Sequence, residues 1–261
     1  MTEIPRQVPY KGTTPPNPSE YWERSALGYL RHVEGETGGD GMLIREEVLH
    51  PLMLEHLGDV RERLVFDASC GEGILSRELM KQGAKVVGGD IVFQFLKAAR
   101  AAEPSTTAAV LDTTKTFPFP EATFDAVFSN LAFMWLPDIE TPTRESYQIL
   151  KPGGKLVVSI THPLINLGKF DLSEPEAPKL ILQAPLQEGI WLKMINETNG
   201  PYPYYQRSPG TYVNTFTRAG FRVSPSRGYH DVFFSEAFLQ KHPGYLQHKW
   251  YPLFLIFELI K

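Results

Sequence analysis

The 261-residue sequence contains one cysteine, Cys70, so the chain cannot form an intrachain disulfide and offers no cysteine cluster for zinc. No apolar run approaches the ~20 residues that a membrane-spanning helix needs. Residues 1–18 are polar and proline-rich, which is not the composition of a signal peptide. We therefore expect a soluble, cytoplasmic protein that does not associate with membranes.

An excess of positive charge is also missing. The 26 Lys and Arg residues are outnumbered by 30 Asp and Glu residues, which gives a net charge of −4. Nucleic-acid-binding proteins usually carry a basic patch, so we expect no nucleic-acid partner. The histidines are scattered without metal-ligand spacing, and we expect no metal site.

The stretch 64–79 organises the rest of the chain. A short apolar run passes through Gly71 and Gly73 into a segment with apolar residues at helical spacing, which predicts a buried strand, a tight turn and a helix. Glycines let a ligand approach such a turn closely, and the start of the helix presents free N–H groups and a positive dipole. This pattern favours a nucleotide-like ligand with a carboxylate or phosphate group.

Two acidic residues end neighbouring expected strands. Asp67 closes the first strand, and Asp90 closes the next one, over 85–89. An acid at the second position can accept hydrogen bonds from ribose hydroxyls. A dinucleotide-binding turn would carry a third glycine where Ser76 stands, so the turn departs from the dinucleotide pattern.

Short apolar runs and helical segments alternate from residue 64 onward. Strands are expected over 64–67, 85–89, 108–111, 124–129 and 155–160, and helices over 73–82, 91–102 and 140–150. Strict alternation with short connections predicts an α/β fold with a doubly wound, mostly parallel sheet. Ligands of such sheets bind outside the carboxyl ends of the strands.

Several passages resemble the class I S-adenosylmethionine (SAM) methyltransferases, in particular the small-molecule group of the methyltransferase-11/25 type. Residues 67–73 (DASCGEG) are similar to the family's D-x-G-C-G-x-G motif, with Ser69 in place of its first glycine. Residues 119–130 resemble its passage into strand four, and residues 149–156 resemble its LkPGG turn. The resemblance implies a Rossmann-like sheet of seven strands, closed by expected strands over 221–223 and 250–259.

The resemblance also implies SAM as the cofactor and a set of residues around it. Asp90 would bind the ribose, Asp112 would face the adenine amino group, and Ile91 and Leu131 would flank the adenine. Arg45 would pair with the methionyl carboxylate, unless it belongs to a solvated helix face. The full expected cofactor set is Tyr21, Arg45, Asp67, Ser69, Gly71, Gly73, Asp90, Ile91, Asp112, Thr113, Asn130 and Leu131. Taken singly, such residues are more often turn formers and strand caps.

The acceptor side is expected to be aromatic. His162 follows the fifth expected strand and is the candidate catalytic base, or else a hydrogen-bonding contact for the substrate. The expected substrate contacts are Trp22, Phe133, Met134, Trp135, His162, Tyr204, Tyr205 and Arg207. Each of these residues has a plain alternative role in packing, and Arg207 is the candidate for binding an acidic group.

The domain prediction places an N-terminal arm and helical lid at 1–57 and the methyltransferase core at 58–261, with a substrate-binding insert at 163–210. Either Asn17 or Ser19 would cap the first helix, and Pro51 would kink or split a helix over 43–57. The expected acceptor is a small molecule, and the protein is expected to be a monomer or a homodimer. Natural product biosynthesis is the expected setting.

Oxygen is favoured as the acceptor atom, followed by nitrogen and carbon. The passage 130–133 (NLAF) lacks the Asn/Asp-Pro-Pro-Tyr sequence typical of enzymes that methylate exocyclic amines. Two alternatives stay open. One is an NAD(P)-dependent oxidoreductase on a Rossmann fold, and the other is a non-catalytic SAM-binding module.

Overall fold

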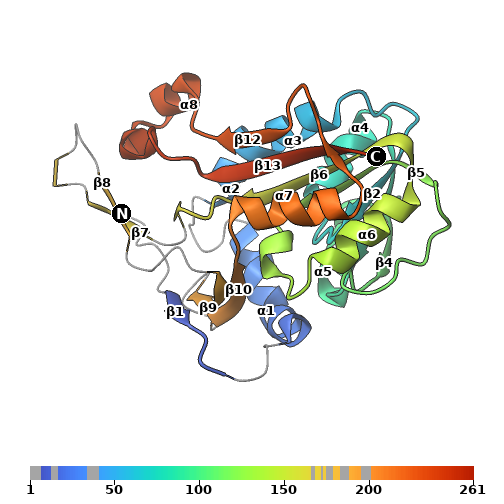
Figure 1. Ribbon diagram of the computed structural model, residues 1–261, viewed down its shortest axis with the longest axis horizontal. Helices are drawn as coiled ribbons and strands as arrows, with labels where there is room; N and C mark the ends of the chain where they lie inside the picture. Colours follow the sequence, from blue (N-terminus) through green and yellow to red (C-terminus); the bar gives the residue numbers. More distant parts are fainter. Residues whose placement is uncertain are drawn as a thin grey trace.

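The largest sheet of the protein has the strand order β11-β13-β6-β5-β2-β3-β4. A computed structural model describes residues 7–12, 17–33, 41–165, 168–171, 173–174, 179–182, 188–194 and 201–261. The strands are β2 (Leu64–Ala68), β3 (Lys85–Asp90), β4 (Thr107–Val110), β5 (Phe124–Asn130), β6 (Leu150–Thr161), β11 (Arg222–Val223) and β13 (Phe254–Ile260). β12 (Tyr229–Val232) also pairs with β13. The prediction of an α/β fold with a mostly parallel sheet of about seven strands is confirmed (Figure 1).

The order in which successive strands are added to the sheet reverses at β2. This strand pairs in parallel with β3 on one side and with β5 on the other, and β13 is antiparallel to β6. A crevice forms at the carboxyl ends where the strand order reverses, because the connections on the two sides leave in opposite directions. The residues after β2, β3, β4 and β5 therefore converge on one place.

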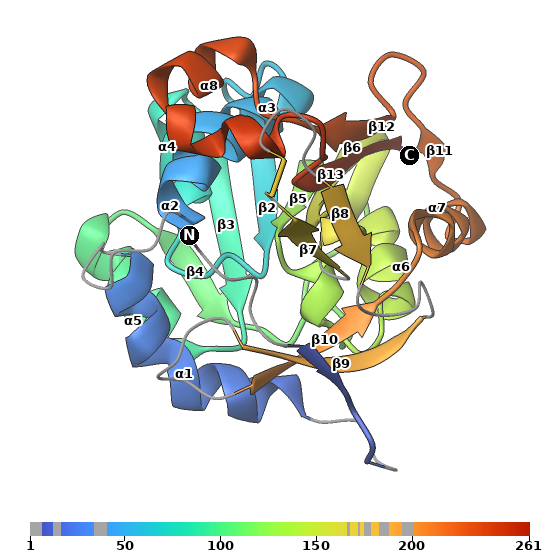
Figure 2. The ribbon, with the colours of Figure 1, turned by 90° about the vertical axis from the view of Figure 1, so that its left-hand side faces the viewer.

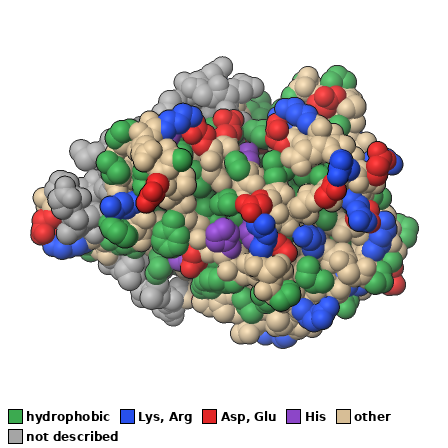
Figure 3. Space-filling model, turned by 90° about the horizontal axis from the view of Figure 1, so that it is seen from above, with side chains coloured by type: hydrophobic (Ala, Val, Ile, Leu, Met, Phe, Trp, Pro, Cys, Tyr) green, Lys and Arg blue, Asp and Glu red, His purple; other side chains and the backbone are tan. Residues whose placement is uncertain are grey.

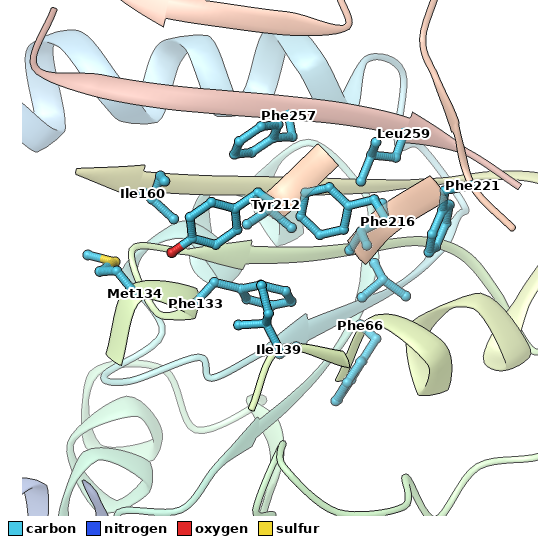
Figure 4. Close-up of a cluster of buried hydrophobic side chains, with 14 of the residues drawn as sticks. Phe66, Phe133, Met134, Ile139, Ile160, Tyr212, Phe216, Phe221, Phe257 and Leu259 are labelled. Carbon is cyan, nitrogen blue, oxygen red and sulfur yellow. The ribbon is translucent and has the colours of Figure 1, made fainter. Parts of the chain in front are cut away.

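Helices cover both faces of the sheet. One face packs on α3 (His50–Leu57), α4 (Ile74–Lys81) and α8 (Glu236–Lys241), with buried contacts from Met53, Leu79 and Phe238. The other face packs on α6 (Glu140–Ile149) and α7 (Pro209–Arg218), where Tyr212 and Phe216 of α7 lie against Phe257 of β13 (Figure 4). α5 (Phe93–Ala102) contacts β3 and β4.

A second, smaller sheet lies across the carboxyl ends of the parallel strands. It consists of β1 (Gln7–Pro9), β9 (Gly189–Met194) and β10 (Pro201–Gln206) in the order β1-β9-β10. α1 (Pro18–Val33) contacts β10 and α5, and Figure 2 shows α1 and this sheet together on one side of the molecule. We call α1 with β1, β9 and β10 the roof. A further pair, β7 (Gly168–Asp171) and β8 (Lys179–Leu182), forms its own hairpin.

Several sequence predictions need adjustment. The segment expected as one helix over 43–57 is α2 (Gly41–Ile44), a π-helical turn (Arg45–Leu49) and α3, with Pro51 in the first turn of α3. β6 begins at Leu150, earlier than expected, and its register with β5 shifts between Phe124 and Ala126. Asn17 rather than Ser19 caps α1, because its side chain accepts a hydrogen bond from the Ser19 N–H. β12, α8 and a 3-10 segment (Pro243–His248) were not predicted.

Other expectations fall on parts of the chain that the structure does not cover. Parts of the N-terminal arm and of the expected insert lie outside the described residues. They are the arm outside residues 7–12 and, in the insert, residues 166–167, 172, 175–178, 183–187 and 195–200. Within the described part, no helix combines the length and the apolar composition needed to cross a bilayer. On the described part of the face in Figure 3, acidic and basic side chains are interspersed.

Candidate active site

A cavity of about 730 Å³ lies at the carboxyl ends of the parallel strands, where the strand order reverses. The residues that the sequence predicted and that line this cavity are Trp22, Arg45, Asp67, Ser69, Gly71, Asp90, Ile91, Asp112, Thr113, Asn130, Leu131, Met134 and Trp135. They come from the carboxyl ends of β2, β3 and β5, from the turns after β2, β3, β4 and β5, from the π-helical turn and from α1 of the roof. Most of the cofactor prediction therefore converges on one cavity.

The turn between β2 and α4 has the backbone conformation that its sequence predicted. Ser69, Gly71 and Gly73 have φ values of 69°, 55° and 72°, and the Ser69 and Cys70 N–H groups donate to the Gly89 carbonyl. A side chain added at Gly71 would meet nothing within 4 Å, so this glycine is needed for its dihedral angle and for open access. The turn is a cradle in which a ligand can approach the backbone.

Asp90 supports this turn from the neighbouring strand. One carboxylate oxygen accepts a hydrogen bond from the Gly71 N–H at 2.9 Å, and the other accepts from the Val92 N–H at 2.9 Å. Burial raises the pKa of Asp90 to about 6, although both backbone bonds act in the opposite direction. The carboxylate is thus fixed in position at the cavity wall, and a polar ligand is the natural way to satisfy its remaining acceptor capacity.

Asp67 and Ser76 explain why the third glycine of a dinucleotide site is missing. The Ser76 hydroxyl donates to an Asp67 carboxylate oxygen at 2.5 Å, and both side chains are buried. Burial raises the pKa of Asp67 to about 8. The serine therefore has a structural partner at the place where a dinucleotide-binding protein needs close helix–strand packing around a glycine.

Arg45 lies in the π-helical turn, a backbone form that is frequent at functional sites. It donates a hydrogen bond of 2.6 Å to the hydroxyl of Tyr29, which belongs to α1 and also lines the cavity. Next to it, burial together with the charge of Arg45 lowers the pKa of His50 to about 4, so this histidine is neutral. Arg45 therefore brings a fixed positive charge to the cavity, and its pairing with a methionyl carboxylate stays a prediction; Tyr29 and His50 were not among the predicted residues.

Short hydrogen bonds also fix the residues at the ends of β4 and β5, which line the cavity. The Asp112 carboxylate accepts from the N–H and the hydroxyl of Thr114, at 2.9 and 2.7 Å. Asn130 accepts from the Ser159 hydroxyl at 2.6 Å, and Leu131 has a positive φ of 55°. These contacts fix the strand ends, so the polar groups that line the cavity are preorganised.

The rest of the cavity is aromatic. Trp22 of α1 lies 5.6 Å from the ring of Trp135 and 4.8 Å from that of Tyr202, between ring centroids. Trp135 follows β5, and Tyr202 belongs to β10 of the roof. Lys193 of β9 also lines this part of the cavity and was not predicted. The cavity thus has a polar half around the β2–α4 turn and an aromatic half beneath the roof.

His162 is not in the cavity lining. Its Nε2 atom lies 3.3 Å from an Asp231 carboxylate oxygen, and its Nδ1 atom accepts from the Leu164 N–H at 3.2 Å. Burial lowers the pKa of His162, although Asp231 acts in the opposite direction. The structure therefore places this candidate base in a buried contact with β12, and the preceding residue, Thr161, lines the cavity instead.

The other predicted residues that lie outside the lining are Tyr21, Gly73, Phe133, Tyr204, Tyr205 and Arg207. Phe133 points into the core beside Phe216, 6.1 Å away between ring centroids (Figure 4). Arg207 donates to the carbonyls of Leu136 and Pro137 at 2.8 and 3.0 Å, so its guanidinium holds the turn after β5. Gly73 begins α4, and Tyr204 packs edge-on against Trp135.

The cradle, the acids and the charge of Arg45 suit SAM, which carries ribose hydroxyls, a carboxylate and positive charge. The described residues contain no group of three or more His, Cys, Asp or Glu side chains that could hold a metal ion.

Comparison with known proteins agrees with this geometry. Residues 66–158 match a model of the methyltransferase domain. A malonyl-[acyl-carrier protein] O-methyltransferase of Pseudescherichia vulneris is 32% identical over 103 residues, which are 40% of this chain and 41% of that protein. A sterol 24-C-methyltransferase of Aspergillus fumigatus is 29% identical over 211 residues, which are 78% of this chain and 50% of that protein. The chain thus spans half or less of the length of these curated relatives.

Solved structures show the same fold. The S-adenosylmethionine-dependent methyltransferase from Mesorhizobium loti superposes with a TM-score of 0.71 at 25% identity, over 81% of this chain and 96% of that one. The matched residues 66–158 hold the β2–α4 turn, Asp90, Asp112 and Asn130, which are the residues at the polar half of the cavity. Residues 66–158 are therefore a methyltransferase domain of the class I SAM-dependent type, with SAM as its cofactor.

Proposed function

We propose that the protein transfers the methyl group of SAM to a small molecule held in the aromatic half of the cavity. One observation carries the proposal: the polar half and the aromatic half belong to one continuous cavity. A donor in the first and an acceptor in the second would be neighbours, and holding two reactants in near-attack geometry supplies much of the acceleration of such a reaction.

In this proposal SAM occupies the polar half of the cavity, which we call the donor half. Asp90 and Asp112 offer fixed carboxylate oxygens to ribose hydroxyls and to an adenine amino group, and Ile91 and Leu131 offer apolar surfaces to the adenine. Arg45, held by Tyr29, offers a guanidinium to the methionyl carboxylate. When bound, SAM supplies an electrophilic methyl group attached to a sulfonium.

The roof has two tasks in this proposal, and both agree with its position. It would exclude water from the reacting groups, and its aromatic rings together with Trp135 would bind a flat or apolar acceptor. An acceptor hydroxyl would form the new bond to the methyl carbon as the bond from carbon to sulfur breaks and SAH leaves as a neutral thioether, and the hydroxyl proton would pass to water when the product leaves the cavity. In this proposal the segment 1–57 acts as a lid over the cavity, and the insert at 163–210 binds the acceptor.

Oxygen is the acceptor atom that we favour, followed by nitrogen and carbon. The relatives include one protein named for O-methylation and one named for C-methylation. The turn after β5 also lacks the Pro-Pro-Tyr sequence typical of enzymes that methylate exocyclic amines. Natural product biosynthesis remains our proposed setting, since aromatic small molecules are common acceptors there.

The hydrogen bond between Ser76 and Asp67 counts against the oxidoreductase alternative, because it occupies the place of the third glycine. The non-catalytic alternative predicts SAM binding without transfer to any acceptor. Ligand binding therefore separates the oxidoreductase from our proposal, and methyl-transfer turnover separates the non-catalytic module from it.

Isothermal titration with SAM, S-adenosylhomocysteine (SAH) and NAD⁺ is the first test. We expect SAM and SAH to bind and NAD⁺ not to bind. Asp90→Ala should weaken SAM by at least ~10-fold, because it removes a hydrogen-bonding carboxylate from a buried site. Glu121→Gln, a change at an exposed carboxylate before β5, is the control and should leave SAM affinity unchanged. Tight NAD⁺ binding without SAM binding would overturn the proposal.

A further inference from the structure

β9 and β10 present one face to the cavity. Lys193 pairs with Tyr202 across the two strands, and Trp191 pairs with Tyr204. Directly opposed residues of an antiparallel pair lie on the same face, and so do alternate residues of one strand. Lys193 lines the cavity, and the rings of Tyr202 and Tyr204 on the same face lie 6.1 and 5.4 Å from Trp135 of the lining, between centroids, so this face of β9 and β10 lies against the cavity wall.

Lys193 carries the positive charge of this face. Its ammonium lies 5.4 Å from the ring centroid of Tyr204, and its half-buried side chain lines the cavity. Burial removes the ammonium from water, which lowers the pKa of Lys193 to about 8. A cation that has lost part of its hydration gains more from an anionic ligand than an exposed lysine does.

The charges of the cavity are separated in space. The acidic residues Asp67, Glu72, Asp90 and Asp112 belong to the polar half, where Lys115 follows β4 and Arg45 is bonded to Tyr29. Lys193 instead belongs to the roof, on the aromatic side. An anionic group of a ligand in the aromatic half would therefore meet the ammonium of Lys193 and be kept away from the carboxylates of the donor half.

We propose that Lys193 binds an oxyanion group of the acceptor, ordinarily a carboxylate, while Trp22 and Trp135 contact its apolar body. The acceptor class is then an amphipathic acid, and Lys193 is the residue that selects it. This inference rests on the proposed function only in taking the aromatic half as the acceptor site.

The test compares two fluorescent probes that share an apolar body and differ in charge. 1-Anilinonaphthalene-8-sulfonate carries an oxyanion, and N-phenyl-1-naphthylamine is its neutral counterpart. Both are titrated into the protein with SAH present, after calorimetry has established whether SAH binds. Failure of SAH to bind would count against the proposed function alone, and the probes would then be compared in the unliganded protein.

We expect Lys193→Met to weaken the anionic probe by ~10-fold or more, the size expected when a charge-assisted hydrogen bond is lost. The neutral probe should change less than about twofold, because its contacts are apolar. Lys193→Arg should retain the anionic probe. Lys97→Met, which removes an exposed lysine of α5, is the matched control and should change neither probe.

The pH dependence gives a readout that a purely structural lysine would not produce. Above about pH 8, affinity for the anionic probe should show a fall beyond the changes caused by Asp67 and Asp90, which titrate in the same cavity, because the ammonium of the unliganded protein loses its proton there. Lys193→Arg should remove this fall, since a guanidinium stays charged. Equal loss of both probes in Lys193→Met, or an unchanged affinity for the anionic probe, would overturn the inference.

Discussion

Arg45 and Tyr29 join two parts of the chain at the wall of the cavity: the guanidinium donates to the phenolic oxygen across 2.6 Å. Arg45 belongs to the π-helical turn before β2, and Tyr29 belongs to α1 of the roof. The bond uses one of the guanidinium's five donors and leaves its planar face in a defined orientation. The roof thereby participates in the donor half as well as in the acceptor half.

Removing the guanidinium should weaken donor binding. We expect Arg45→Met to reduce SAM affinity by ~10-fold or more, because a charge-assisted hydrogen bond to a carboxylate is lost. Tyr29→Phe keeps the charge and releases its orientation, so its effect should be several-fold smaller. Titration calorimetry with SAM and with 5′-methylthioadenosine, which lacks the carboxylate, distinguishes the roles. Equal losses for both ligands in Arg45→Met would contradict the assignment.

Burial of Asp67 should make stability depend on pH. Its pKa is raised to about 8 in the folded protein, so the folded state holds a proton that the unfolded state has released. The contribution of this group is therefore fully present below about pH 4 and is lost as pH rises towards 8. Asp67→Asn should remove a decrease on the order of 1–3 kcal/mol between pH 6 and 8.5. Thermal unfolding of both proteins across this range is the measurement, and parallel curves would refute the assignment.

His162 should behave as a structural residue. We expect His162→Gln to lower the free energy of unfolding by about 1–3 kcal/mol, because its buried contact with Asp231 is disturbed. SAM affinity should change by less than about twofold, since the ring lies outside the cavity lining. Urea unfolding and calorimetry are the two measurements. A large loss of turnover at unchanged stability would restore His162 as the catalytic base.

Arg207 should control the order of the turn after β5. Its guanidinium donates to the Leu136 and Pro137 carbonyls, and a single ammonium cannot reproduce that fork. We expect Arg207→Lys to increase amide hydrogen exchange at residues 133–136 and to cost about 1–2 kcal/mol of stability. Arg222→Lys, at an exposed position of β11, is the control. Unchanged exchange would show that the turn holds itself.

The parallel core could be predicted because its signals are local. Central strands of a parallel sheet are buried on both faces, so runs such as 64–67 and 85–89 stand out as apolar segments. The carboxyl ends of these strands gather at one edge whatever the loops do. The sequence alone therefore predicts that Asp67, Asp90 and Asn130 share one site.

The errors have a different origin. Successive residues of a strand point to opposite faces, so a residue at a strand end has two possible directions. The side chain of Thr161 lines the cavity, whereas the ring of His162 lies against Asp231 of β12, a strand that was not predicted. Lys193 could not be found because its position depends on the pairing of β9 with β10 and β1, which joins distant parts of the chain.

The pairing of β1 with β9 also sets an order of events during synthesis. Residues 7–9 pair with residues 191–193, so the N-terminal strand cannot form this pairing until most of the chain has left the ribosome. Contacts this far apart in sequence form slowly, because the entropy cost of closing a long loop comes before the contacts stabilise the chain. The strands of the donor half are made long before β9 and β10. The nascent protein should therefore possess its nucleotide-binding edge while its aromatic half still stands open to the cell.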